Sequence, residues 1–218
     1  MLTEKLLDLK KNLLEYAALA EMMVADGIQG LLQKDEAKLK NILGKYEPQA
    51  NFREIELDEK CTSLLAQYQP KAKDLRTILM ALGMNRDLER IGDHAVNIAQ
   101  SALYLLERPP LQPLRDLPRL SGLVNGMLRD SVNAFLQENS VLGKNVCGRD
   151  DEVDKLRAQI LRKLIACMSA DTSTIERALH IIRICGNLER IADLTTNIGE
   201  EVIFMAEGRV LKHHQGEK

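Results

Sequence analysis

The residues best suited to chemistry in this sequence are carboxylates and amides that recur every four positions. Glu89, Asp93 and Asn97 follow this spacing within residues 88–98. Because a helix turns about 100° per residue, side chains at i, i+4 and i+8 form one stripe along its surface. Such a stripe of oxygen ligands could coordinate a metal ion, exchange protons as an acid and a base, or pair with arginine.

The same stripe occurs again 100 residues further along the chain. Glu189, Asp193 and Asn197 repeat the polar positions, and residues 188–198 match residues 88–98 at seven of eleven positions. One acidic stripe is usually a solvated helix face, but its repetition favours a function because solvent-facing positions are normally free to vary. An apolar stripe suited to a core lies on another side of the first helix and consists of Leu88, Ile91, Ala95, Ile98, Ala102 and Leu105.

Two further segments carry acidic pairs at the same helical spacing. Glu54 and Asp58 form one pair, and Asp150 and Asp154 form the other. If each pair lies on a helix antiparallel to a motif helix, two rows of carboxylates face each other. A site made only of oxygen ligands suits hard cations or iron rather than zinc.

Other interpretations of these acids remain open. They could be neutralised in surface ion pairs by nearby arginines, namely Arg86, Arg90, Arg183 and Arg190. A metal-dependent phosphohydrolase could use the same carboxylates, although we find no P-loop, nucleophile elbow or H-E-x-x-H motif. His94 could act as a base or ligand, but Leu194 replaces it in the second copy. A helical scaffold with acidic stripes for solubility is a third interpretation.

The elements that must position these residues are helices. Charged residues make up 28% of the chain, aromatic residues 3%, and tryptophan is absent, a composition that favours helices. Apolar residues at intervals of three and four predict long helical stretches. These cover about residues 3–46, 51–69 and 71–108 in the first half, and 119–142, 150–168 and 172–207 in the second.

The order of these helices predicts an all-α fold of two tandem antiparallel three-helix bundles. Four of the six prolines lie in residues 108–118, where they cannot continue a helix and therefore form a stiff connector. The predicted parts are a first bundle at 1–108, the connector at 109–118, a second bundle at 119–208 and a tail at 209–218.

Composition also limits the partners and the compartment. The net charge of −2 argues against nucleic-acid binding, which needs a basic surface. No segment reaches the roughly 18 apolar residues of a membrane span. The N-terminus has the pattern of an amphipathic helix rather than a signal peptide, so the cytoplasm is expected. The four cysteines lack C-x-x-C spacing and are expected to be reduced thiols.

At the repeated motif the sequence resembles the PhoU family of phosphate-signalling proteins. The motif of that family has the form Leu-Glu-Arg-Ile-Gly-Asp followed by Asn-Ile, and it occurs here at residues 88–98 and, with Ala192 for the glycine, at 188–198. A further family feature, a Gln-Pro-x-Ala-x-Asp-Leu-Arg turn, is present at residues 69–76. The resemblance covers about residues 54–108 and 150–213.

This resemblance implies two three-helix bundles related by a pseudo-twofold axis, with metal ions bound on their faces. The metal would be iron or zinc, with magnesium as a further candidate. Carried over to this chain, the ligands would be Glu89, Asp93, Glu189, Asp193, Glu54, Asp58, Asp150 and Asp154, and Asn97 and Asn197 are candidates for additional polar ligands.

The resemblance also implies a regulator that acts without catalysis. Family members link a phosphate ABC transporter and its ATPase subunit to a sensor histidine kinase, and they repress the phosphate-starvation response when phosphate is plentiful. Such a protein would meet the membrane only through its partners. Exposed faces of long helices make a homodimer the expected oligomer. The atypical residues 46–51 leave open a divergent accessory protein of another transporter.

Overall fold

The computed structural model describes residues 2–207, apart from the side chains of residues 112, 113 and 207. The regular elements in that range are all helical, which confirms the predicted all-α class. The predicted tail at 209–218 lies outside the described residues. The long helices are α1 (Leu2–Gln33), α3 (Glu47–Tyr68), α4 (Ala72–Leu106), α5 (Leu117–Gln137), α7 (Asp150–Ala170) and α8 (Ile175–Glu207).

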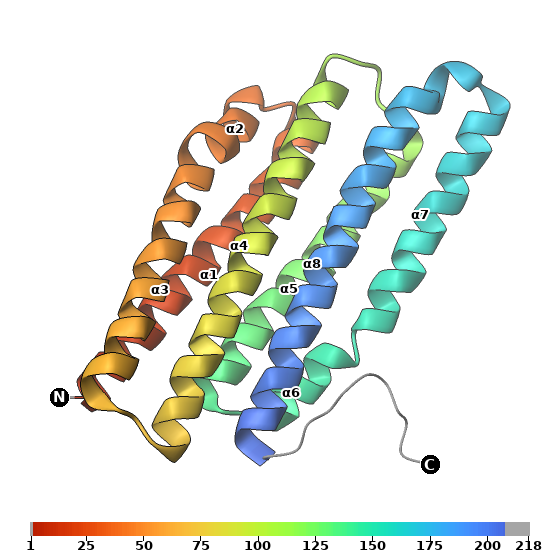
Figure 1. The fold of residues 1–218 in the computed structure, drawn as a ribbon. Coiled ribbons are helices and arrows are strands. Elements are labelled where there is room, and N and C mark those ends of the chain that lie inside the picture. Colours follow the sequence, from red (N-terminus) through yellow and green to blue (C-terminus); the bar gives the residue numbers. More distant parts are fainter. Residues whose placement is uncertain (1, 208–218) are drawn as a thin grey trace, which may run out of the picture.

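The long helices form two bundles that lie side by side (Figure 1). The first bundle contains α1, α3 and α4, and the second contains α5, α7 and α8 in the same order. Apolar side chains of both bundles belong to one continuous core, in which α4 packs against α8 and α1 against α5. The predicted apolar stripe of α4 is confirmed, because its residues from Leu88 to Leu105 are all buried.

Short elements interrupt the simple three-helix plan at each bundle's first connection. They are α2 (Glu36–Asn41), a π-helical turn (Ile42–Tyr46) and α6 (Ser140–Cys147). The sequence predicted one helix through residue 142, but α5 ends at Gln137 because Glu138 takes a left-handed φ of 53°. Asn139 then caps α6 by accepting hydrogen bonds from the backbone amides of Val141 and Leu142, each at 3.1 Å.

The glycines in the middle of α1 do not interrupt the helix. α1 runs unbroken through Gly27 and Gly30, which are both buried. A Cβ at Gly27 would lie 2.9 Å from Cγ2 of Ile98, and a Cβ at Gly30 would lie 2.7 Å from Cδ2 of Leu39. These glycines therefore serve close packing of α1 against its neighbours.

The outer helices α3 and α7 bury only narrow faces. Large apolar side chains on their other faces, Ile55 and Ile165, are 55% and 50% exposed. α3 contacts α1 and α4 on one side only, through a stripe that includes Leu57 and Leu64. Ile55 is two residues before Leu57, about 200° away around the helix, and therefore faces solvent.

The proline-rich connector is held against the second bundle. Its middle forms a 3-10 turn (Gln112–Asp116), and Pro118 lies in the first turn of α5. Arg177 donates a hydrogen bond to the carbonyl of Pro109 at 3.0 Å, and Lys163 pairs with Asp116 at 2.6 Å. The exact limits of the two predicted domains stay a prediction. None of the helices among residues 2–207 combines the length and apolar content that crossing a membrane requires.

Candidate functional site

The two copies of the motif lie next to each other, where α4 and α8 pack antiparallel. Three contacts between the helices define their register, Tyr104 with His180, His94 with Asn187, and Gly83 with Glu201. In this antiparallel register, residues near the start of α4 lie beside residues near the end of α8. The segments 88–98 and 188–198 therefore meet at the middle of the pair, close to the pseudo-twofold axis.

One contact between the two motif helices is a hydrogen bond made by a buried part of a histidine side chain. Nδ1 of His94 donates to Oδ1 of Asn187 at 2.9 Å, and Asn187 in turn donates from Nδ2 to the carbonyl of Arg183 at 2.7 Å. Burial lowers the pKa of His94, and the positive charges of Arg190 and Arg90 add to that effect against the hydrogen bond to Asn187. His94 is therefore a neutral group that joins the helices.

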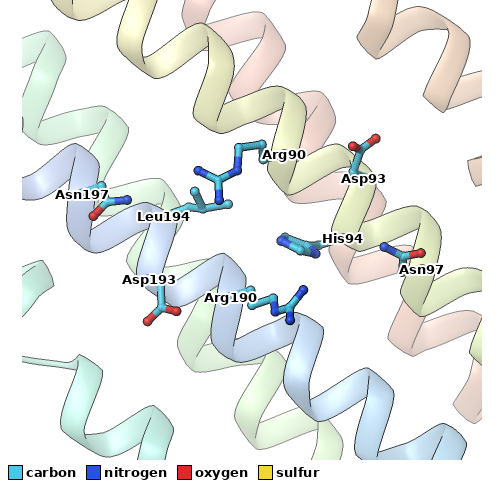
Figure 2. A pocket seen from close by; sticks show the side chains of 8 residues that line it. All are labelled: Arg90, Asp93, His94, Asn97, Arg190, Asp193, Leu194 and Asn197. Carbon is cyan, nitrogen blue, oxygen red and sulfur yellow. The ribbon is translucent and has the colours of Figure 1, made fainter.

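A groove of about 550 Å³ follows the crossing of the two motif copies. It is lined by the same positions from both helices, Arg90, Asp93, His94 and Asn97 on α4 and Arg190, Asp193, Leu194 and Asn197 on α8. Figure 2 shows Arg90 and Arg190 reaching from α4 and α8 toward the opposite helix, whereas Asp93 and Asp193 point away from the groove. The side chains of the arginines and of these two aspartates thus point in different directions.

In the first bundle the carboxylates gather around a buried tyrosine. Burial raises the pKa of Glu89, and the negative charges of Asp93 and Glu54 raise it further. Burial also raises the pKa of Tyr16, and the same three carboxylates add to the shift. The hydroxyl of Tyr16 is buried without a hydrogen-bond partner. Within residues 2–207, Glu54, Glu89 and Asp93 have no ion-pair partner.

The second bundle gathers the corresponding acids but partly neutralises them. Burial raises the pKa of Asp193, and the charges of Glu189 and Asp154 add to it, while Arg157 and Arg190 oppose the shift. Nε of Arg157 lies 3.1 Å from Oε2 of Glu189. The ion-pair interpretation of the acidic stripe therefore applies to this half, although the cation comes from α7 and not from the motif.

The remaining predicted ligands have other neighbours. Asp58 accepts a hydrogen bond at 3.2 Å from Nδ2 of Asn85, which also donates to the backbone carbonyl of Glu54 at 2.8 Å. Asp150 is the first residue of α7 and contributes to raising the pKa of Cys147, which burial brings to about 11. The candidate ligands Asn97 and Asn197 line the groove, so the structure places them with the arginines.

A metal ion fits the first bundle better than the second. Within the described residues no three His, Cys, Asp or Glu side chains converge at metal-binding distance. The described residues of the first bundle nevertheless combine an orphaned buried hydroxyl with carboxylates that repel one another and make no ion pair, although the charge of Arg90 acts weakly on Glu89. A cation would relieve that repulsion. In the second bundle Arg157 already supplies part of this charge.

Sequence reasoning missed some residues of this site. Tyr16 has the spacing of a core residue of α1, and nothing local in the sequence indicates that its hydroxyl faces acids from α3 and α4. Arg90 and Arg190 were considered only as partners of the acids. Their repetition in both copies of the motif was the available signal for a role of their own.

Comparisons with known proteins agree with this arrangement. The family model described as the PhoU domain matches residues 13–102 and again residues 117–202. A phosphate-specific transport system accessory protein PhoU homolog of Aquifex aeolicus is 35% identical over 212 residues, which cover 97% of this chain and 96% of that protein. A homolog 2 of the same name from Thermotoga maritima is 30% identical over 217 residues, which cover 100% of this chain and 92% of that protein.

Solved structures resemble the whole fold. The crystal structure of PhoU from Pseudomonas aeruginosa matches with a TM-score of 0.91 and 32% identity, covering 96% of this chain and 100% of that one. The phosphate transport system regulatory protein PhoU from Streptococcus pneumoniae matches with a TM-score of 0.89 and 25% identity, covering 97% and 100% of the two chains. The arrangement of helices described above is therefore shared with those proteins.

Proposed function

Since this chain belongs to the PhoU family, with one PhoU domain in each half, we propose that it is an accessory regulator of a phosphate transport system. The relatives named above carry that role in their names. The protein acts by binding: two rigid bundles joined by one core present long helical faces to partners. The observation that carries this proposal is the meeting of both motif copies at the crossing of α4 and α8.

The partners are the ATPase subunit of a phosphate ABC transporter and a sensor histidine kinase. The protein links the two in the cytoplasm, represses the phosphate-starvation response when phosphate is plentiful, and reaches the membrane only through them. A homodimer is the oligomer we propose, because the outer faces of α3 and α7 leave large apolar side chains such as Ile55, Phe52 and Ile165 exposed.

The cellular role has a direct test. Deleting the gene should derepress alkaline phosphatase in phosphate-rich medium and alter phosphate uptake, and expression of the intact chain should restore repression. Unchanged phosphatase activity and unchanged uptake in the deletion strain would remove the basis for this function. A purified protein that turned over phosphoesters, with loss of turnover in Asp93→Ala, would instead make it an enzyme.

We also propose that the acidic cluster of the first bundle, formed by Glu54, Glu89 and Asp93 beside Tyr16, holds a metal ion. Iron, zinc and magnesium are the candidates, and the oxygen ligands favour iron or magnesium. The ion supplies positive charge to carboxylates that have no ion-pair partner among the described residues, and it offers open coordination positions to a partner. Support comes from the mutual repulsion of the three carboxylates and from the orphaned tyrosine hydroxyl.

Metal binding should be visible in the thermal stability of chelator-treated protein. At a metal concentration about a hundredfold above Kd, we expect Tm to rise by about 5 to 10 °C. The double variant Glu89→Gln, Asp93→Asn should lose this rise. Its metal-free Tm should exceed that of the native protein, because the substitutions remove repulsion that the raised pKa of Glu89 reflects. Differential scanning fluorimetry measures both effects.

Two further variants serve as controls. Glu56→Gln removes a charge from an exposed position of α3 outside the cluster and should keep the full response. Glu189→Gln should reduce the response less than the first-bundle variant, because Arg157 already neutralises Glu189. An equal metal-induced rise in the native protein and in the first-bundle variant would refute this assignment.

A further inference from the structure

The groove between α4 and α8 contains two arginines that, among the described residues, make no ion pair with the acidic clusters of the two bundles. Among the described residues Arg190 makes no ion pair, and the only ion pair of Arg90 is a 3.9 Å contact with Asp87, which is about 13% exposed. Both arginines are exposed, and the 3.9 Å contact with Asp87 is too long for a hydrogen bond, so it does not occupy the N–H groups of Arg90. Their N–H donors therefore remain available to a ligand in the groove.

The acids that also line the groove belong to other surfaces. Asp93 and Asp193 point away from it in Figure 2. Asp93 acts on Glu89 and Tyr16 in the first bundle, and Asp193 is coupled to Glu189 and Asp154 in the second. Besides these two carboxylates, the groove is lined by two guanidinium groups, the neutral ring of His94, the side chain of Leu194 and the amides of Asn97 and Asn197.

The symmetry of these donors determines the shape of the ligand. Arg90 and Arg190 occupy the same position in the two copies of the motif, so they approach the groove from opposite walls. A guanidinium presents its N–H groups as a planar fork that matches two oxygens of one anion. A tetrahedral oxyanion can offer a pair of oxygens to each of two opposed forks, whereas a carboxylate offers only one such pair.

We propose that the groove between α4 and α8 binds inorganic phosphate through Arg90 and Arg190. The groove volume of about 550 Å³ leaves room for water around the anion. Recognition of a tetrahedral oxyanion rests on the paired arginines, while the choice of phosphate among such anions rests on the proposed function. Binding at this position would contact both bundles at once, since one arginine comes from each.

Isothermal titration calorimetry of the full chain with inorganic phosphate tests the proposal. The protein is treated with chelator and dialysed, so that no metal bridges phosphate to the acids, and ionic strength is held constant. Arg90→Ala and Arg190→Ala should each weaken phosphate binding by about tenfold or more, and the double variant should show no measurable binding. Arg162→Ala removes an equally exposed arginine from α7, outside the groove, and should leave affinity unchanged.

A conservative pair of variants separates fork geometry from charge. Arg90→Lys and Arg190→Lys keep the charge but not the fork, so we expect clearly weaker binding than in the native protein with unchanged helical circular dichroism. These variants also keep the test valid if the double alanine variant does not fold. Sulfate and ATP, titrated in parallel at equal ionic strength, distinguish free phosphate from other tetrahedral anions and from a nucleotide.

The outcomes differ for this inference and for the proposed function. No binding of phosphate to the native chain, equal binding by the double arginine variant, or tighter arginine-dependent binding of sulfate or ATP would each overturn the inference. If phosphate does not bind but deletion of the gene still derepresses alkaline phosphatase, only the groove assignment fails. If phosphate binds as described and deletion changes nothing in the cell, the proposed function fails instead.

Discussion

Replacing Gly143 by valine should lower the free energy of unfolding by about 3 kcal/mol. α6 and α8 approach at this point with their backbones almost in contact. A Cβ at Gly143 would lie 2.9 Å from the carbonyl oxygen of Gly199, and a Cβ at Gly199 would lie 3.1 Å from the carbonyl oxygen of Gly143. Because the obstacle is backbone, no side-chain rotation can relieve the clash, and the helices must separate.

A matched control is available on α5. Nothing lies within 4 Å of a Cβ at Gly122, which is exposed on that helix. Gly122→Ala should therefore raise the free energy of unfolding by up to about 1 kcal/mol, since alanine is the better helix former. Urea unfolding monitored by circular dichroism measures both variants. A Gly143→Val protein as stable as the native one would show that α6 does not pack on α8 as described.

Glu201 should make the unfolding free energy fall as pH rises from about 4.5 to about 7, and Glu201→Gln should remove that part of the pH dependence. The pKa of Glu201 is raised from 4.5 to about 7, mainly by burial and also by the charge of Asp87, while Arg86 opposes the shift. Oε2 of Glu201 is buried without a hydrogen-bond partner. It packs over Gly83, where an added Cβ would lie 2.9 Å from it. The folded state therefore holds the proton more tightly than the unfolded state.

The sign of the effect follows from that difference in proton affinity. Below pH 4.5 both states bind the proton and the contribution of Glu201 to stability is complete; it is lost as pH rises through about 7. The carboxyl is partly exposed, so we expect a loss of about 1 to 2 kcal/mol rather than the full value of the shift. Asp87, whose pKa burial raises to about 6, makes stability fall with rising pH in the same way. The pocket that Glu201 lines also contains Arg76 and Arg86.

The measurement uses a window above the ordinary carboxyl range. Glu138 has a lowered pKa, because Lys73 and Lys10 donate hydrogen bonds to it, so its contribution is lost only as pH falls. Urea titrations at pH 5.0, 6.0, 7.0 and 7.5, about half a unit or more above the ordinary carboxyl range, therefore exclude such acids. His94 and His180, whose pKa values burial lowers, titrate in the same window with the opposite sign, so the difference between the native protein and the double variant Glu201→Gln, Asp87→Asn at each pH isolates the two raised acids. A slope equal to that of the native protein in Glu201→Gln would contradict the assignment.

The sequence by itself determined the helical class, the duplication and the core stripe of the motif helices. Leu88, Ile91 and Ala95 are buried as their spacing requires, because a period of 3.6 leaves one face for the core whatever its neighbours are. The spacing also identified the paired acids of each half, and Glu54 does lie close enough to Glu89 and Asp93 to affect the pKa of Glu89. Local spacing is enough for these features, since the residues involved lie on one helix or on helices joined by a short turn.

Only the tertiary structure decided which surfaces the polar residues serve. The antiparallel packing of α4 on α8 brings Arg90 and Arg190 into one groove and turns Asp93 and Asp193 outward. It also places Arg157 on Glu189 and leaves Tyr16 among unpaired acids. These outcomes depend on the angle and register between helices far apart in the chain. That geometry is set by side-chain packing along the whole interface, and the spacing of residues within a single helix does not encode it.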